Sequence, residues 1–346
     1  MNDTRMTSLQ RVLTTLGHQE PDRVPLFLLL TMHGAKELGL SIKDYFSSSR
    51  NLVEGQLRLR AKYRHDCIYN FYYAPLEVEA WGGEVIYSDD GPPNSGEPLI
   101  KKFEDIKALK IPEIGRTSVL EKVLESAQAL KQQVGDEAPI IGVVMSPFSL
   151  PVMQMGFDKY LQLMYENQSL FYRLMDLNTE FCVNWANAQL AAGATAICYF
   201  DPVSSTTIIP RQMYLKTGFN IARQTIAQIN GPTATHMASG RCLPMVDDIS
   251  KTGTTMVGVS GIEDLQALKT ACRNKLTLLG NLNGIEMCRW GIKETEQQVK
   301  QAISQAASGG GFILCDNHGE IPWQVSEDVL MTISDNVRKW GRYPLN

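Results

Sequence analysis

The stretch GATAICYFD, residues 193–201, decides the fold of this chain. A glycine that ends a helical segment leads into a short apolar run, and an acidic residue follows the run. Further apolar runs of this kind alternate with helical stretches along the chain. The eight predicted strands are Val24–Leu30, Cys67–Phe71, Ile140–Met145, Thr195–Phe200, Thr233–His236, Thr255–Val259, Leu276–Gly280 and Phe312–Leu314. Eight strand–helix units predict an α/β fold, the closed (β/α)8 TIM barrel, rather than an open sheet.

The remaining segments predict one domain over residues 1–346 with two additions to the barrel. Residues 1–20 predict an N-terminal helix that covers the closed end. Residues 81–115 predict a β-hairpin inserted after strand two, with strands at 82–88 and 98–103. The loop between them, 89–97, is rich in turn-forming residues. Ser326 is a plausible N-cap for a last helix.

Composition narrows the class of protein. The net charge of −4 and the lack of a Lys/Arg cluster argue against a nucleic-acid surface. No apolar stretch approaches the ~20 residues of a membrane span. The seven cysteines are scattered, odd in number and without a CxxC pair. This usage indicates a reducing compartment, so we expect a cytoplasmic protein.

Polar residues stand just past several of the predicted strands. A barrel gathers these positions at its open end, where the chemistry of such enzymes takes place. We expect Asp201 and Glu79 to act as acid, base or orienting groups, and His236 to take part in catalysis. The candidates for substrate contact are Tyr72, Ser146 and Asn281.

Each candidate also has a purely structural interpretation. Asp201 precedes a proline and could cap the next segment. A lone histidine such as His236 is more often a packed core residue than a ligand. Glu77 and Glu79 would share one face of an extended segment, or they could form a solvated loop edge. His318 lies among turn-forming residues.

Histidines from strands five and eight could nevertheless converge on a metal. Zinc accepts imidazole, thiolate and carboxylate ligands, and a catalytic zinc keeps one position open. The predicted ligands are His236, His318 and Cys315. Gly309-Gly310-Gly311 is not a phosphate-binding loop, because a strand rather than a helix follows it.

The order of these motifs resembles the uroporphyrinogen decarboxylase superfamily, and within it the methylcobamide-dependent methyltransferase branch. The resemblance covers nearly the whole chain and implies a TIM barrel. The segments that carry it are Asp22–Pro25, Glu77–Gly82, Ser146–Leu150, Asp201–Ser205, Ile209-Pro210, His236, Gly280–Asn283, Gly309–Leu314, His318 and Ile321-Pro322.

The resemblance also separates two activities. Decarboxylases of this superfamily carry an Arg-Gln-Ala-Gly-Arg segment after strand one, which holds the carboxylates of a porphyrinogen. The corresponding residues 30–36 read LTMHGAK and contain no arginine. Arginine binds carboxylates bidentately, so a substrate with eight carboxylates would lack its partners here.

The methyltransferase branch typically binds zinc through a His-x-Cys after strand five and a cysteine after strand eight. Here His236 is present, but Ala238 stands at the cysteine position and Cys242 is four residues away. His318 matches the second position, with Cys315 just before it. Exchanging thiolates for imidazole makes a metal a stronger Lewis acid, which favours activating a leaving group.

We therefore expect a methyltransferase that moves a methyl group between a small molecule, such as a methoxy compound or methylated amine, and a corrinoid. The cobalamin would arrive on a partner corrinoid protein, because the chain has no Asp-x-His-x-x-Gly motif. A decarboxylase or lyase acting on a smaller acid is the alternative enzyme. A non-catalytic corrinoid-binding homologue is the third interpretation.

Overall fold

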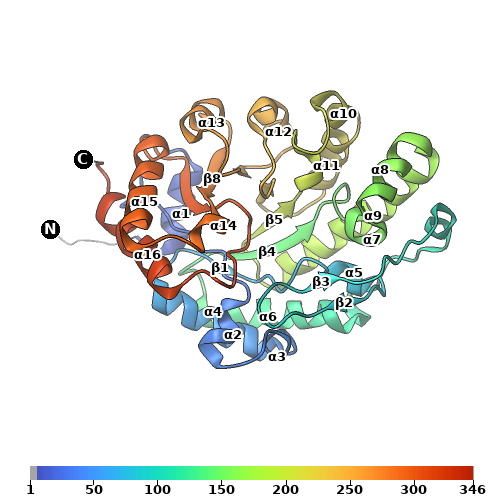
Figure 1. The fold of residues 1–346 in the computed structure, drawn as a ribbon, viewed down its shortest axis with the longest axis horizontal. Coiled ribbons are helices and arrows are strands. Elements are labelled where there is room, and N and C mark those ends of the chain that lie inside the picture. Colours follow the sequence, from blue (N-terminus) through green and yellow to red (C-terminus); the bar gives the residue numbers. More distant parts are fainter. Residues whose placement is uncertain (1–5, 346) are drawn as a thin grey trace.

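The computed structural model describes residues 6–345. In this part of the chain a curled sheet of seven parallel strands has the order β1-β4-β5-β6-β7-β8-β9 (Figure 1). The strands are β1 (Ile68–Tyr69), β4 (Ile140–Met145), β5 (Ala196–Phe200), β6 (Thr233–His236), β7 (Met256–Gly258), β8 (Thr277–Leu282) and β9 (Phe312–Asp316). The predicted α/β fold with parallel strands is confirmed. Seven of the eight predicted runs overlap these strands, and β8 and β9 extend two residues beyond the predicted ends.

The eighth run, residues 24–30, is wrong as a regular strand. It makes two backbone hydrogen bonds to β9 at one edge of the sheet and one to the segment before β1 at the other. The Leu314 N–H donates to the Pro25 carbonyl at 3.0 Å, the Phe27 N–H donates to the Leu314 carbonyl at 2.9 Å, and the Asp66 N–H donates to the Leu26 carbonyl at 2.7 Å. Pro25 has no N–H to give, so a continuous ladder cannot form through it. An irregular segment therefore lies between β9 and the residues that precede β1.

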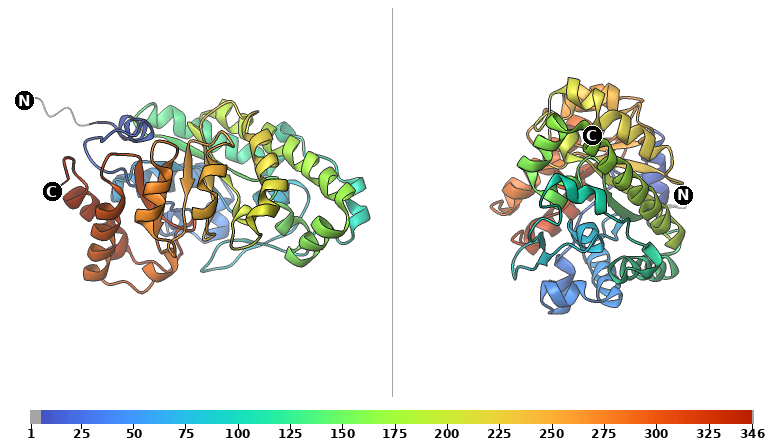
Figure 2. Two further views of the ribbon diagram at one scale, coloured as in Figure 1. Left: turned by 90° about the horizontal axis from the view of Figure 1, so that it is seen from above. Right: turned by 90° about the vertical axis from the view of Figure 1, so that its right-hand side faces the viewer.

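Helices surround the sheet (Figures 1 and 2). A typical one has buried residues three or four apart, as Val123, Ala127 and Leu130 do in α6. The helices are α1 (Ser8–Leu16), α2 (His33–Leu38), α3 (Ile42–Phe46), α4 (Ser49–Tyr63), α5 (Leu76–Ala80), α6 (Ser118–Val134), α7 (Pro151–Met155), α8 (Phe157–Glu166), α9 (Gln168–Ala192), α10 (Arg211–Lys216), α11 (Gly218–Ile226), α12 (Val246–Ile249), α13 (Leu265–Cys272), α14 (Gly284–Met287), α15 (Ile292–Ala306) and α16 (Glu327–Trp340).

The predictions for the first and the last helix are confirmed. The predicted N-terminal helix is α1, and residues 1–5 of that prediction lie outside the described part. Ser326 caps α16, because its side chain accepts a hydrogen bond from the Val329 N–H. Between residues 6 and 345 no helix is both long and apolar enough to span a membrane.

The predicted hairpin is confirmed only in part. β2 (Val85–Ile86) pairs with β3 (Asn94–Ser95), which lies inside the stretch predicted as a loop. The predicted second strand, 98–103, instead runs past α7, where the Ile100 N–H donates to the Gln154 carbonyl. The turn-forming residues therefore close the hairpin earlier than the apolar pattern indicated.

Candidate functional site

A cavity of about 380 Å³ lies at the open end of the barrel, where the strands end at their carboxyl side. Loops after β1, β4, β5 and β9 form its wall, which is mostly apolar. Phe71, Met145, Phe157 and Phe200 contribute large side chains, and Glu320 contributes a carboxyl group. Among the described residues that line it, none is arginine or lysine. The cavity can therefore hold a small apolar molecule and offers no cation to an anionic one.

Asp201 lies immediately behind this wall. Its side chain is 1% exposed and accepts hydrogen bonds from the Ser146 hydroxyl at 2.6 Å and the Ser149 hydroxyl at 2.8 Å. Burial raises the pKa of Asp201, and the serine hydroxyls act against that rise. Of these three residues only Ser149 reaches the cavity. Asp201 and Ser146, predicted as catalytic and substrate-binding, thus lie one layer away from it.

His236 ends β6 and stacks on Phe200, with ring centroids 4.8 Å apart and planes 2° from parallel. Its Nδ1 accepts a hydrogen bond from the Ala238 N–H at 2.9 Å, and its buried Nε2 has no partner. Burial, with a smaller contribution from nearby His318, lowers the pKa of His236 to about 3. The ring is neutral at pH 7, and its proton sits on Nε2 because Nδ1 is an acceptor.

His318 approaches this pair from the loop after β9. The next residue, Gly319, has φ +83° and packs so closely that an added Cβ would lie 2.5 Å from the Phe200 ring and 3.3 Å from Cε1 of His236. Nδ1 of His318 is in hydrogen-bond contact with the Ser239 hydroxyl, and its Nε2 is buried without a partner. The fold therefore brings loops from strands five and eight of the predicted series to one place.

The predicted metal ligands do not fit a zinc centre. Zinc on Nε2 of His236 would need the proton on Nδ1, where the Ala238 N–H already points. The Cys315 thiol is buried, lies 3.5 Å from the Asp316 carboxylate, and has a pKa raised well above its usual value by burial. Within residues 6–345 no three His, Cys, Asp or Glu side chains are arranged to hold a metal ion.

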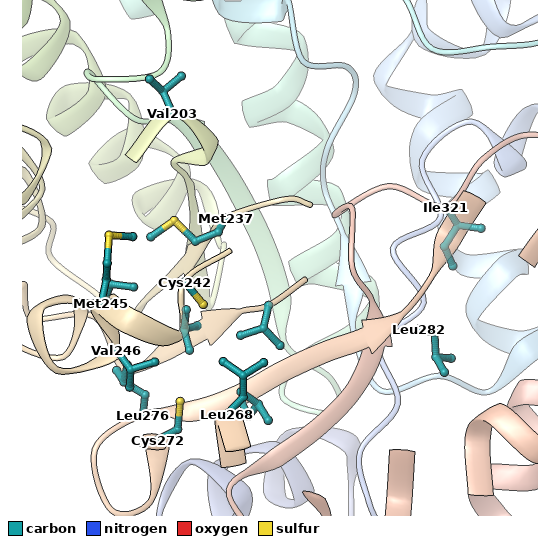
Figure 3. Close-up of a cluster of buried hydrophobic side chains, with 14 of the residues drawn as sticks. Val203, Met237, Cys242, Met245, Val246, Leu268, Cys272, Leu276, Leu282 and Ile321 are labelled. Atoms are coloured by element: carbon teal, nitrogen blue, oxygen red, sulfur yellow. The ribbon is translucent and has the colours of Figure 1, made fainter. Parts of the chain in front are cut away.

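Cys242, the thiol nearest in sequence to the missing ligand, does not take its place. It is fully buried and points into an apolar cluster with Met237, Met245 and Leu268 (Figure 3). Burial raises its thiol pKa well above the ordinary value. A thiol in that state is not a nucleophile at neutral pH, and Cys242 does not line the open-end cavity.

Glu77 and Glu79 lie on a helix, α5, and not on an extended segment as predicted. Glu79 faces away from the cavity and accepts a hydrogen bond from the Tyr73 hydroxyl at 2.6 Å. Glu77 turns inward, where its Oε1 accepts from the Met145 N–H at 2.8 Å and its Oε2 has no partner. Burial raises the pKa of Glu77 to about 8, so it is mainly protonated at pH 7.

The other two candidates for substrate contact point elsewhere. The Tyr72 hydroxyl donates to the Lys122 carbonyl in α6 at 3.2 Å, and the Lys122 amine lies over the Tyr72 ring. The Asn281 amide donates to the Ser260 carbonyl at 2.9 Å. Neither residue lines the open-end cavity.

Glu320 was not among the predicted site residues, and it is the carboxyl group on the cavity wall. Its Oε1 accepts a hydrogen bond from the Thr31 hydroxyl, in the segment after residues 24–30. Burial raises the pKa of Glu320 to about 7, and the charge of Asp316 contributes. The run of polar residues after strand eight pointed to this loop, but the pattern cannot tell which of them faces the cavity.

Comparisons with known proteins agree with this architecture. The family model described as "Uroporphyrinogen decarboxylase (URO-D)" matches residues 7–340. A uroporphyrinogen decarboxylase from Idiomarina loihiensis is 22% identical over 334 residues, which cover 90% of each protein. The methylcobamide:CoM methyltransferase MtbA from Methanosarcina acetivorans is 24% identical over 216 residues, covering 61% of this chain and 62% of that protein.

A solved structure with the same fold is a methyltransferase from Methanosarcina mazei. It is 19% identical, has a TM-score of 0.86, and the match covers 96% of this chain and 99% of that one. A B12-independent methionine synthase from Shewanella is more distant, with 12% identity, a TM-score of 0.57 and coverage of 86% and 89%.

Proposed function

The chain belongs to the uroporphyrinogen decarboxylase family, and on that premise we propose that it is a methyltransferase. It moves a methyl group between a small methylated molecule and a corrinoid carried by a partner protein. The names of two similar proteins, MtbA and the Methanosarcina mazei methyltransferase, support this choice within the family. The observation that carries it is the open-end cavity, which is apolar and has a single carboxylic acid on its wall.

The same cavity disfavours the decarboxylation that gives the family its name. Uroporphyrinogen carries eight carboxylates. Burying a carboxylate without a cation costs several kcal/mol by general estimates. The described residues on the wall include no arginine or lysine, and Glu320 would add repulsion when ionised. A neutral or cationic methyl donor avoids both costs.

The residues around the cavity then have defined roles. The apolar wall excludes water from the methyl group. When the bond between the methyl carbon and its heteroatom breaks, the electron pair stays on the heteroatom, and the Glu320 carboxyl group gives that atom its proton. The carboxylate regains a proton from solvent. The reduced corrinoid of the partner supplies the electron pair that receives the methyl group.

Asp201 and His236 act as positioning residues in this proposal. Asp201 orients the Ser149 hydroxyl on the wall through the bond at 2.8 Å. His236 supports Phe200 by stacking. Glu79, Tyr72 and Asn281 do not line the cavity, so they make no contact with the substrate. The donor set does not fit zinc, so no step uses a metal bound by this chain.

Exposed apolar residues border the open end and suit a partner protein. Phe157, Ile208, Ile262 and Ile285 are 40%, 38%, 59% and 56% exposed, and they lie in the segments that follow β4, β5, β7 and β8. Exposed apolar groups around a cavity are typical of a docking surface. A corrinoid domain seated there would present its cofactor to the cavity.

Methyl transfer to free cob(I)alamin tests the proposal. We expect a neutral methoxy compound or a methylated amine to convert cob(I)alamin to methylcobalamin, followed by the visible spectrum. Glu320→Gln should slow the reaction, whereas Glu79→Gln, a carboxylate off the cavity, should leave it unchanged. Carbon dioxide release from a small acid without methyl transfer would establish the lyase alternative. Binding of methylcobalamin without turnover, across a panel of donors, would establish the non-catalytic one.

A further inference from the structure

A second cavity, of about 440 Å³, lies at the closed end of the barrel, far from the chemistry proposed above. It is bordered by the start of α1, the end of α4 and the segment that leads into β1. Half of its described lining residues are arginines, and one is a carboxylate, Glu137. The arginines are Arg11, Arg23, Arg60, Arg64 and Arg338.

Two of these arginines are already neutralised and have a structural role. Arg11 and Arg23 converge on the buried carboxylate of Asp66, at 2.8 and 2.6 Å. Arg11 also pairs with Asp22 at 2.6 Å. These bonds attach α1 and the segment 22–26 to the floor of the barrel, so neither guanidinium needs a ligand.

Arg60 differs from Arg11 and Arg23, because the carboxylate nearest to it is farther away. Its Nη1 lies 3.6 Å from the exposed carboxylate of Glu137, and its buried Nε has no hydrogen-bond partner. An unsatisfied buried donor costs about 1–3 kcal/mol. A guanidinium that lines a cavity and keeps one N–H unsatisfied can bind an oxyanion.

His65 presents a second unsatisfied donor on the same wall. It is 1% exposed, and its Nε2 has no partner, while its Nδ1 lies 3.7 Å from the Cys67 sulfur. Burial lowers the pKa of His65 to about 4, so the ring is neutral at pH 7. With the thiol donating to Nδ1, the proton of the ring is on Nε2.

The start of α1 adds a favourable field. Thr7, the N-cap, and Ser8 line the cavity, and the first turn of this nine-residue helix has no acidic residue. The positive end of the helix dipole therefore faces the cavity, while the Leu9 and Gln10 N–H groups donate to the Glu137 carbonyl and the Thr7 hydroxyl and leave the anion to the side chains. The unsatisfied N–H groups of Arg60 and His65, together with the field of the helix N-terminus, favour an anionic acceptor in this cavity.

We propose that this cavity binds a phosphate group, either inorganic phosphate or the phosphate of a small monoester, with Arg60 and His65 as direct donors. A tetrahedral oxyanion offers acceptors in several directions, which suits donors that come from different segments. Bound phosphate would tie the start of α1 to the end of α4. Because the site lies at the opposite end from the open-end cavity, it is independent of the proposed methyl transfer.

Calorimetric titration and thermal unfolding of the whole chain test this proposal, with inorganic phosphate and glycerol 3-phosphate as probes and sodium chloride at matched ionic strength as the reference. We expect saturable binding of phosphate and a rise in Tm that chloride does not reproduce. The tighter of the two probes identifies the source of the phosphate group.

Substitutions on α4 locate the site. Arg60→Gln should weaken phosphate binding at least about tenfold, since a charge-assisted hydrogen bond of roughly 1.5–3 kcal/mol is lost. Arg60→Lys, which keeps the charge, should bind with intermediate affinity and guards against a folding defect. Arg58→Gln is the matched control, because Arg58 is exposed on the same helix and pairs with Glu54 at 2.7 Å. Equal effects of chloride and phosphate, or wild-type affinity in Arg60→Gln, would overturn the proposal.

Discussion

The two ends of the barrel treat buried carboxyl groups in opposite ways. At the closed end, Asp66 is paired with two arginines and accepts the Leu26 N–H at 2.9 Å, and its pKa is lowered despite full burial. Toward the open end, the buried Asp201 and Glu77 and the partly buried Glu320 have no cation as a hydrogen-bond partner, and the pKa of each is raised. A carboxylate held by cations stabilises the fold. A carboxyl group held without them has a raised pKa and is better suited to donate a proton near neutral pH.

The largest effect expected from this contrast is at Asp66. Asp66→Asn leaves Arg23 buried without a counter-charge and leaves Arg11 with Asp22 alone, so the free energy of unfolding should fall by about 3–5 kcal/mol. Urea denaturation at pH 7 measures it. Asp335→Asn, at the exposed pair with Arg64, is the control and should cost less than about 1 kcal/mol.

The sign of the pH dependence at Asp66 follows from its lowered pKa. The stabilisation is complete above the unfolded-state pKa of about 4 and is lost as the pH falls through the folded-state pKa. The gap between wild type and Asp66→Asn should therefore narrow below about pH 4. A gap that stayed constant there would contradict the ionic role of Asp66.

At the open end we expect the largest effect on the rate of methyl transfer, from a substitution at Glu320. Glu320→Gln keeps the shape of the carboxyl group and removes its proton, so methyl transfer should slow by about 100-fold, in the range of general acid catalysis. Donors with good leaving groups should be affected less, because they need no proton. A uniform loss with all donors would show that Glu320 acts only through packing.

At Glu77 the contrast between the two ends should appear in how the free energy of unfolding depends on pH. Its folded-state pKa of about 8 lies above the ordinary value of 4.5. Its contribution is therefore complete below about pH 4.5 and is lost as the pH rises through 8. Relative to Glu77→Gln, wild type should lose about 1.4 kcal/mol of unfolding free energy between pH 6 and 7. Urea denaturation of both proteins at these pH values measures the difference, and parallel pH profiles would exclude a buried neutral Glu77.

The smallest effect is expected at Ser149, between Asp201 and the open-end cavity. Ser149→Ala removes one donor to Asp201 and leaves the Ser146 bond in place. Stability should fall by about 1 kcal/mol, and the pKa of Asp201 should rise because one bond to its charged form is lost. Thermal unfolding measures the first effect. An unchanged Tm would show that the Ser149 bond contributes little.

Much of the architecture could be predicted because it depends on local patterns. Alternating apolar runs and helices located seven strands, and Gly193 and Ser326 marked helix ends. The segment 24–30 has the composition of a strand, but Pro25 interrupts its ladder. The second hairpin strand was misplaced because the turn residues closed the hairpin earlier than the apolar pattern suggested.

The site was harder to predict, because it depends on the direction of individual side chains. Residues after the predicted strands five and eight were expected to meet, and the loops that carry His236 and His318 do meet around Phe200. Glu79 does not line the cavity because α5 is a helix, in which Glu77 and not Glu79 turns inward. The Tyr72 hydroxyl bonds to α6 instead.

The sequence by itself determined the strand–helix alternation, the end of the barrel at which polar residues gather, and the lack of arginines after the first predicted strand. These properties follow from residue type and spacing alone. Only the tertiary structure decided that Glu320 faces the cavity, that the Ala238 N–H occupies Nδ1 of His236, and that Arg60 and His65 share a wall at the closed end. Each of these facts depends on contacts between segments far apart in the chain, where burial and hydrogen-bond geometry set the state of the group.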